Sequence, residues 1–371
     1  MGRDTLIRRG RRGAVIYNPR SECEVYRTAS STAPLGGAQD SNLANHSDRD
    51  AAQALWYTAP GKAELRSEPL TAPGEGEVRV RATFGALSRG TESLVFNGRV
   101  PVAEYGRMGA PFMGGAFPFP VKYGYATVGV VESGPGKLAG RNVFTLHPHQ
   151  DRFNHPQDAV FPLPQDVPPT RAVLAANMET ALNAVWNAMP GPADRIAVVG
   201  GGVVGMLVAY LCGQMPGAEV TLVDIDPARA QVAHALGVSF SAPAGAPTGC
   251  DVVVHASGAA AGLETAIGLA GDEATVLELS WFGSGSVAVA LGGAFHSQEL
   301  RLVCSQVGHV ARSHRPRWTH ARRLAAAIGL LRDPRLDVLL SPAVDFNALP
   351  ARLADILGRP GGTLCQLITY P

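Results

Sequence analysis

The chain has 371 residues, of which 46% are hydrophobic and 17% charged, so we expect globular folding in two domains and exclude disorder throughout. A net charge of +1, without a basic stripe interleaved with aromatic residues, argues against a nucleic-acid partner. No uninterrupted apolar run reaches the roughly 20 residues that cross a bilayer, and the five scattered cysteines suggest reduced thiols, so we expect a cytoplasmic protein with no membrane partner.

Residues 1–50 differ in composition from the rest of the chain. They are rich in arginine at first and then in Ser, Ala, Asn, Asp and Gly, without sustained periodicity. We interpret them as a flexible N-terminal extension. An organelle-targeting peptide and an overlong translation start are the alternatives.

Strand-like segments follow up to about residue 171. Residues 77–82 alternate apolar and charged side chains, which is the period of a half-buried strand, and residues 125–132 and 141–146 show a similar pattern. Glycine and proline separate these segments. Many short strands joined by turns predict a barrel-like β unit.

The pattern then becomes helical and afterwards alternates between strands and helices. A helix is predicted over residues 172–187, before Pro190. The predicted strands after it are 196–199, 220–223, 252–254, 275–279 and 300–304. Apolar strands between helices are typical of a parallel sheet covered on both faces. Two helices, 318–331 and 349–357, and a strand over 363–369 end the chain.

A glycine-rich turn follows the first of these apolar strands. Gly200 permits a tight turn, Gly202 lets the backbone approach a pyrophosphate, and Gly205 lets helix and strand pack closely. The helix that begins at Val203 and Val204 offers unpaired N–H groups to an anion. This strand, turn and helix predict a dinucleotide-binding site.

An acidic residue in the expected place selects between the two nicotinamide cofactors. Asp224 ends the next strand, nineteen positions beyond Gly205, where the fold places the group that binds the adenosine ribose. Because a carboxylate repels a 2′-phosphate, NAD(H) is favoured, while the nearby Arg229 leaves NADP(H) as the alternative. Ser257 and Ser280 follow later strands, where we expect the nicotinamide half.

The chain resembles the medium-chain dehydrogenase/reductase superfamily, the alcohol-dehydrogenase-like fold, over residues 55–370. The supporting segments are LSRGTE at 87–92, PVKYGYATVG at 120–129, GRNV at 140–143, the glycine turn, and DVVVHASG at 251–258. The resemblance implies an α/β fold with a GroES-like β-rich catalytic domain (51–173 and 311–371) and a Rossmann domain with a doubly wound parallel sheet (174–310). It also implies a homodimer.

The sequence departs from the zinc-dependent members of this superfamily. The position of their cysteine ligand is Ser88, that of their histidine is Tyr125, and the following glutamate is Ala126. Their four-cysteine lobe is missing, and only Glu179 matches a third ligand position. We therefore expect no catalytic zinc. The alternative is an atypical zinc site held by Glu179, His149 and water.

Two of these segments, SRGTE and the Gly-Tyr pair, look closer to a branch of the superfamily that includes the bacteriochlorophyllide hydroxyethyl dehydrogenase. The matching sequence segments are short. Because the walls of the substrate pocket rather than the scaffold set substrate choice, the resemblance implies no particular substrate.

Without a metal, a side chain has to supply the proton that accompanies hydride transfer to a carbonyl. Tyr125 is the first candidate, because it stands at a metal-ligand position. Ser88 and Thr91 are candidates for orienting substrate or relaying protons, and His149 is a candidate for reaching the cleft. Turn capping and ordinary packing are the alternatives for all four residues.

Three further residues are assigned to the cofactor by the resemblance. Arg89 matches a position that reaches the pyrophosphate, and its alternative is an ion pair with Glu92. Thr180 matches a position beside the nicotinamide, and Ser305, after the last strand, is expected to close the same pocket. Ordinary helix packing and strand termination are the alternatives for these two.

The function expected from the sequence is a zinc-independent, NAD(H)-dependent oxidoreductase. Its substrate would be a small alcohol, ketone or enone. An atypical zinc-dependent alcohol dehydrogenase and a non-catalytic dinucleotide-sensing protein are the alternatives. The sequence further predicts that His155 is an exposed strand residue and that the basic segment 310–323 is a solvated helix face.

Overall fold

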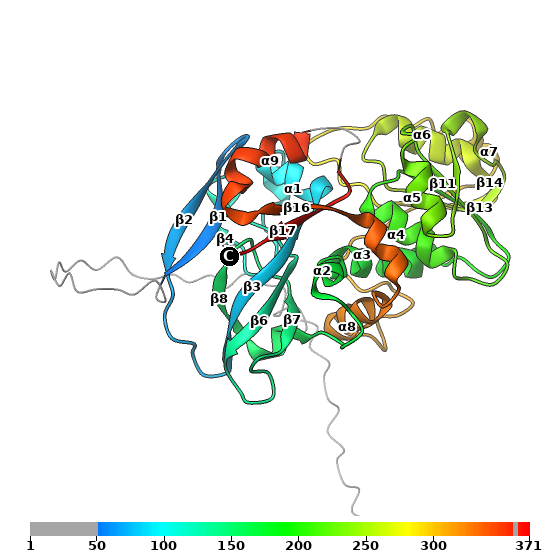
Figure 1. The fold of residues 1–371 in the computed structure, drawn as a ribbon. Helices are drawn as coiled ribbons and strands as arrows, with labels where there is room; N and C mark the ends of the chain where they lie inside the picture. The colour runs from blue at the N-terminus through cyan, green and yellow to red at the C-terminus, as the bar shows by residue number, and fades with distance from the viewer. Residues whose placement is uncertain (1–50, 359–362) are drawn as a thin grey trace, which may run out of the picture.

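The computed structural model describes residues 51–358 and 363–371, and the predicted N-terminal extension lies outside them. Two parts lie side by side in Figure 1: a β-rich part that contains both ends of the described chain, and an α/β part formed by the middle of the chain. Among the described residues, no helix is both long and apolar enough to span a membrane.

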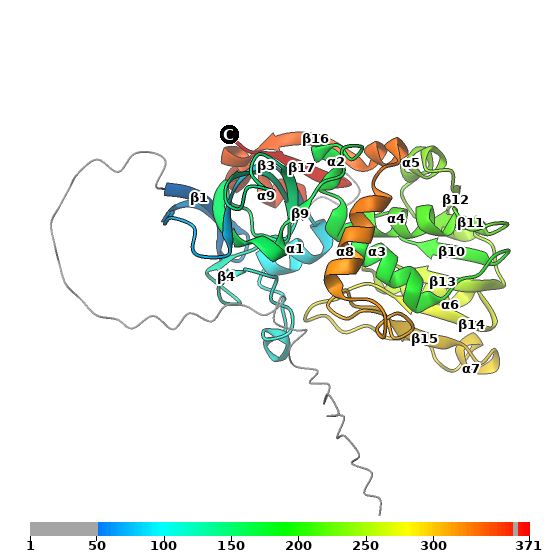
Figure 2. The ribbon, with the colours of Figure 1, turned by 90° about the horizontal axis from the view of Figure 1, so that it is seen from below.

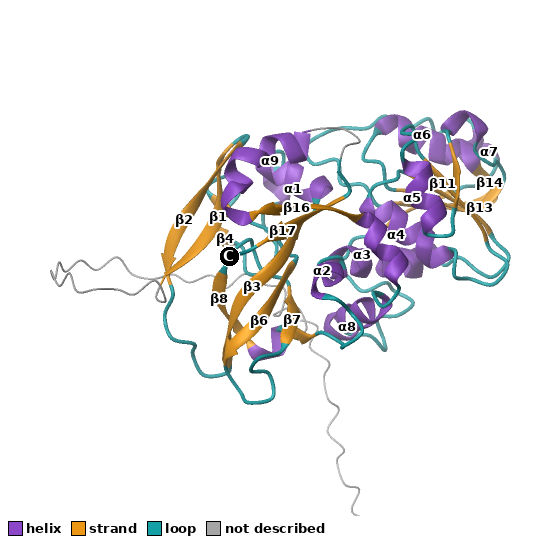
Figure 3. Ribbon diagram, in the orientation of Figure 1, coloured by secondary structure: helices purple, strands orange, loops and turns teal. Residues whose placement is uncertain are grey.

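The β-rich part contains two sheets, whose strands are drawn in orange in Figure 3. One sheet has the order β2 (Lys62–Pro69), β1 (Ala51–Ala59), β5 (Val121–Lys122), β4 (Gly114–Gly115). The other has the order β16 (Leu340–Asp345), β17 (Cys365–Thr369), β3 (Glu77–Leu87), β6 (Thr127–Ser133), β7 (Asn142–Thr145), β9 (Phe161–Pro162), with β8 (Arg152–Pro156) paired to β3. The end of the chain therefore returns to the β-rich part in which the described chain begins, where β17 pairs with β3.

The α/β part is built on a parallel sheet. Its order is β12 (Ser239–Ser241), β11 (Glu219–Val223), β10 (Arg195–Val199), β13 (Cys250–His255), β14 (Ala270–Glu278), β15 (Arg301–Cys304), and every neighbouring pair is parallel. When the six strands are numbered 1 to 6 in the order in which they occur in the chain, their order across the sheet is 3-2-1-4-5-6, which is the Rossmann order. The order reverses beside β10, where ligands bind in such sheets.

Helices cover both faces of the parallel sheet, as Figure 2 shows from below. The helices of the described chain are α1 (Arg89–Phe96), α2 (Pro169–Ala172), α3 (Ala175–Ala188), α4 (Val203–Cys212), α5 (Arg229–Ala235), α6 (Ala260–Leu269), α7 (Ala294–Ser297), α8 (His320–Leu330) and α9 (Leu349–Gly358). Alternate residues of β10 face opposite sides: Ile196 and Val198 pack with α4, and Ala197 and Val199 pack with α6. This two-sided burial explains why the strands are apolar throughout.

Two predictions about individual residues are wrong. His155 is fully buried in β8, where its Nε2 lies within hydrogen-bonding distance of the Thr145 hydroxyl and burial lowers its pKa to about 3. Arg323 is also fully buried, so the basic segment is not solvated throughout. Both side chains have partners from other elements, which local periodicity does not reveal.

Candidate active site

The glycine turn lies between β10 and α4 at the carboxyl edge of the parallel sheet. Gly200 has a φ of +114°, and a Cβ there would lie 2.5 Å from the backbone nitrogen of Ser257. A Cβ on Gly205 would lie 2.0 Å from the carbonyl oxygen of Gly200. Nothing among the described residues lies within 4 Å of a Cβ built on Gly202, so the backbone before Val203 faces open space. This cradle fits a dinucleotide diphosphate, which the open first turn of α4 can bind.

Asp224 lies directly beside this turn. Its carboxylate accepts hydrogen bonds from the backbone N–H of Gly201 and, at 2.8 Å, from that of Asp226. The stem of Arg229 packs against Gly201, and its guanidinium lies 3.3 Å from Asp226. An acidic and a basic group thus both flank the place where an adenosine ribose would lie.

Arg89 makes different contacts from the ion pair with Glu92 that the sequence allowed. Its guanidinium donates to the carbonyl oxygens of Ile356, at 3.0 Å, and Thr363. Burial lowers the pKa of Arg89, and the positive charge of Arg229 lowers it further by a smaller amount. Of these two arginines, Arg229 is the one whose side chain lies beside the glycine turn.

The remaining residues assigned to the cofactor are engaged with protein groups. Thr180 donates to the carbonyl oxygen of Ala176 in its own helix at 3.0 Å. The Ser305 hydroxyl accepts from the amide of Asn187 at 2.8 Å. Ser257 is exposed beside Gly200 and hydrogen bonds to His255. Of the three, Ser257 lies directly against the dinucleotide turn.

The structure brings Tyr125, Ser88 and Thr91 together. Tyr125 packs against both large core clusters, and the hydroxyls of Ser88 and Thr91 lie close enough to its phenol to influence its pKa. The pKa of Tyr125 is raised to about 12, mainly by burial and to a smaller extent by the nearby Glu92 carboxylate. The hydroxyls of Ser88 and Thr91 oppose this increase. The phenol therefore keeps its proton across the physiological range and can donate it.

The role of Glu92, a buried carboxylate close to Ser88 and Tyr125, was not predicted from the sequence. Glu92 accepts hydrogen bonds from the Tyr57 hydroxyl at 2.8 Å, from His149 Nε2 at 2.9 Å and from the Ser88 backbone at 2.8 Å. All three side chains of this network are fully buried. His149 Nδ1 has no hydrogen-bond partner among the described residues. A glutamate in the first turn of α1, four residues after Ser88, was the available signal.

The donor set does not fit the zinc alternative. The Glu179 carboxylate accepts from Arg323 Nε at 3.0 Å, while His149 Nε2 is bound to Glu92. The two proposed ligands thus belong to separate networks. Within residues 51–358 and 363–371, no three His, Cys, Asp or Glu side chains cluster as a metal site would require.

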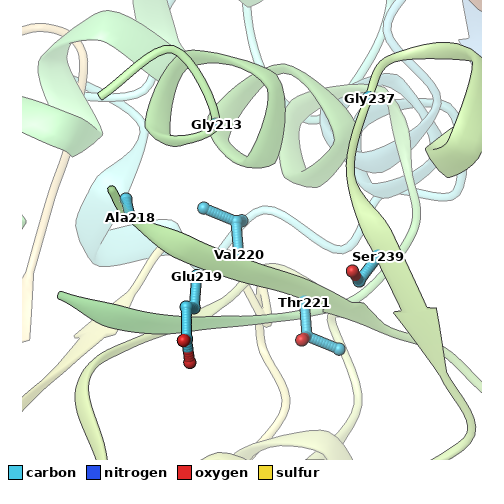
Figure 4. A pocket seen from close by; sticks show the side chains of 7 residues that line it. All are labelled: Gly213, Ala218, Glu219, Val220, Thr221, Gly237 and Ser239. Carbon is cyan, nitrogen blue, oxygen red and sulfur yellow. The ribbon is translucent and has the colours of Figure 1, made fainter. Parts of the chain in front are cut away.

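A hollow of about 350 Å³ lies elsewhere on the parallel sheet, and Figure 4 shows the side chains that line it. It is lined by Gly213, Ala218, Glu219, Val220, Thr221, Gly237 and Ser239. These residues lie where β11 and β12 begin, whereas Asp224 follows the other end of β11. The hollow is therefore distinct from the dinucleotide cradle.

Comparison with solved structures shows what this arrangement is similar to. L-idonate 5-dehydrogenase from Escherichia coli K-12 matches with a TM-score of 0.71 and 14% identity, over 86% of this chain and 98% of that one. An alcohol dehydrogenase from E. coli CFT073 complexed with NADH matches at 0.69 and 15%, over 86% and 100%. A zinc-binding dehydrogenase from Sinorhizobium meliloti bound to NADP matches at 0.68 and 17%, over 86% and 99%.

No protein-family model and no curated protein sequence matches the chain. The structural matches nevertheless extend over nearly the full length of each dehydrogenase, including its cofactor-binding part. The predicted fold class is confirmed: this chain has the fold of these dehydrogenases, a GroES-like β-rich domain joined to a Rossmann domain.

Proposed function

We propose that the protein is a zinc-independent oxidoreductase that uses NAD(H) to interconvert an alcohol and a carbonyl compound. The observation that carries this proposal is the open backbone at Gly202 beside the carboxylate of Asp224, at the carboxyl edge of a Rossmann sheet. The side chain of Arg229 beside Gly201 supports it, because a positive charge near this turn favours a bound diphosphate.

The residues of the chain would divide the work between binding and proton transfer. The first turn of α4 would hold the diphosphate and Asp224 the adenosine ribose. When bound, the dinucleotide supplies the hydride. Tyr125 would donate its phenolic proton to the carbonyl oxygen, and the hydroxyls of Ser88 and Thr91 would orient the phenol and pass a proton back to it.

Cofactor binding is tested by titration calorimetry with NADH and NADPH. We expect wild-type protein to bind NADH more tightly than NADPH, and Asp224→Asn to lose about tenfold in NADH affinity because the ribose loses a charged acceptor. Asp251→Asn is the matched control, since this carboxylate accepts from the Arg195 backbone at the opposite end of the sheet. Absence of heat with both dinucleotides contradicts the proposal.

Catalysis is tested by a screen of alcohols, ketones and enones that follows the absorbance of reduced nicotinamide. Tyr125→Phe should lower the turnover number about 10²- to 10⁴-fold while NADH affinity stays within twofold, because only proton transfer is lost. Tyr105→Phe is the control, as this tyrosine packs in the β-rich core. If the substitution of Tyr125 changes no activity, a dinucleotide-sensing protein is the better description.

A further inference from the structure

Three side chains at the carboxyl edge of the parallel sheet are joined in a chain of hydrogen bonds. His255 ends β13 and Glu278 ends β14, and the strand register pairs them directly. His255 Nδ1 donates to Glu278 Oε2 at 2.7 Å, and the Ser257 hydroxyl lies 2.6 Å from His255 Nε2. Because the carboxylate accepts the Nδ1 proton, Nε2 carries the lone pair and accepts the serine proton.

Neighbouring groups hold both ends of this row of hydrogen-bonded side chains in place. Glu278 also accepts from the Ser280 backbone at 2.6 Å, which fixes the carboxylate. His255 is fully buried whereas Ser257 is exposed, so the serine end meets solvent. A Cβ on Gly262 would lie 2.1 Å from the Ser257 hydroxyl oxygen and 2.8 Å from His255 Nε2. The contact therefore depends on a glycine in the first turn of α6.

Backbone donors lie next to the serine. Helix α6 begins at Ala260, three residues after Ser257, and the Ala259 N–H donates to the Ser257 hydroxyl oxygen at 3.2 Å. The first N–H groups of a helix have no partner within the helix and favour negative charge. An oxyanion that forms on a group bound to Ser257 would lie near these donors.

We propose that Ser257, His255 and Glu278 form a second catalytic site, in which the Ser257 oxygen is a nucleophile toward small activated carboxylic esters. A nucleophile hydrogen-bonded to a base, which is in turn oriented by a carboxylate, is the geometry that acyl transfer requires. The acyl transfer itself needs neither the dinucleotide nor Tyr125, although Ser257 lies against the dinucleotide turn.

The reaction is balanced with the ester and water alone. The Ser257 oxygen forms a bond to the ester carbonyl carbon as its proton passes to His255 Nε2. The bond from this carbon to the alcohol oxygen then breaks, and the leaving alcohol takes the proton from His255. Water attacks the acyl-serine with His255 again accepting a proton, which releases the carboxylic acid and restores the serine.

Labelling with an alkyl fluorophosphonate tests the nucleophile on the full chain without added dinucleotide. Fluoride leaves as the Ser257 oxygen bonds to phosphorus, and mass spectrometry of peptides locates the adduct. We expect one adduct, on Ser257, together with hydrolysis of p-nitrophenyl acetate that Ser257→Ala abolishes. A native chain that carries no adduct on Ser257, or that hydrolyses the ester no faster than Ser257→Ala does, overturns the proposal.

A pair of glycine variants tests whether His255 activates Ser257, or whether Ser257 reacts only because it is exposed. Gly262→Ala pushes the Ser257 hydroxyl away from His255 and should slow labelling at least about tenfold, although alanine favours a helix. Gly268→Ala, on the same helix with nothing among the described residues within 4 Å of the new Cβ, should label at the wild-type rate. Glu278→Gln should slow hydrolysis about 10²- to 10⁴-fold. Equal labelling rates for the two glycine variants contradict the proposal.

Discussion

Glu92 shows how a single buried charge organises the β-rich half of the candidate active site. Its carboxylate accepts from Tyr57, His149 and the backbone of Ser88, which come from three separate segments of the chain. It also contributes to the raised pKa of Tyr125. We therefore infer that Glu92 holds the shape of the site beneath the hydroxyl group of Ser88, Thr91 and Tyr125.

Replacing this carboxylate by an amide should destabilise the protein. We expect Glu92→Gln to lower the free energy of unfolding by about 2 kcal/mol, because an amide turns an NH₂ group toward donors that need an acceptor. Urea unfolding measures the change, with Glu75→Gln in an exposed turn as the control that stays within about 0.5 kcal/mol. Equal stability of the two variants would show that the Glu92 network contributes nothing net.

Individual residues differ in how far the sequence predicts their surroundings. The grouping of Tyr125 with Ser88 and Thr91 was predicted because the resemblance placed all three at one site. The contact between Glu92 and His149 joins positions 57 residues apart and exists only once β3, α1 and the segment after β7 are packed. The link between His255 and Glu278 follows from strand register, which becomes known only with the sheet order.

At the level of elements, apolar runs and glycine turns predicted most of the parallel sheet. β10, β11, β13, β14 and β15 lie where apolar runs indicated strands. β12 was missed because Ser239–Ser241 is short, has two serines and lies at the edge of the sheet, where an apolar face is not required. The strand predicted to begin at residue 125 begins at Thr127, so Tyr125 stands just before β6 and is free of its period-two pattern.

The packing of α8 on α3 depends on one buried arginine. Arg323 lies on the apolar stripe of α8 beside Leu324, Ala327 and Ile328. Its guanidinium donates to Glu179 at 3.0 Å, to Asn183 at 2.6 Å, and to carbonyl oxygens of the segment between β15 and α8. Four acceptors from two other segments thus make a charged side chain compatible with a buried position.

Removing this arginine should loosen α8 from α3. Arg323→Met leaves the Glu179 carboxylate buried without its partner, which should lower the free energy of unfolding by about 3 kcal/mol. Adding Glu179→Met should restore at least about 1 kcal/mol, and a double-mutant cycle in urea measures this coupling. Arg322→Met, an exposed neighbour that stacks on Trp318, should cost less than about 1 kcal/mol. Additive effects of the two core substitutions would contradict the coupling.

The same pair makes the stability of the protein depend on pH. Burial raises the pKa of Glu179 from 4.5 to about 7, against the opposing effect of Arg323. The folded state therefore binds a proton more readily than the unfolded state, and this group lowers stability as the pH rises from about 4.5 to 7. Glu179→Gln should lose less stability than wild type between these pH values in urea unfolding. A steeper loss in the variant would contradict the assignment.

Across the whole molecule, one hydrophobic core connects the two parts. It contains Val128 and Phe144 of the β-rich sheets, α3, and Ile196 and Leu222 of the parallel sheet. A separate cluster that includes Val78, Val131 and Phe153 belongs to the β-rich part alone. The two parts should therefore share some of their cooperativity although their sheets are separate.

Two phenylalanines that lie nine residues apart, Phe144 in β7 and Phe153 in β8, test this connection. Each is buried, so either change to alanine should cost about 3 to 5 kcal/mol. Phe144→Ala should raise hydrogen exchange in β11 as well as in β6, because its cavity opens into the shared core. Phe153→Ala should raise exchange mainly in β6. Mass spectrometry of peptides from both strands measures the difference, and unchanged exchange in β11 of Phe144→Ala would mean that the shared core does not couple the two parts.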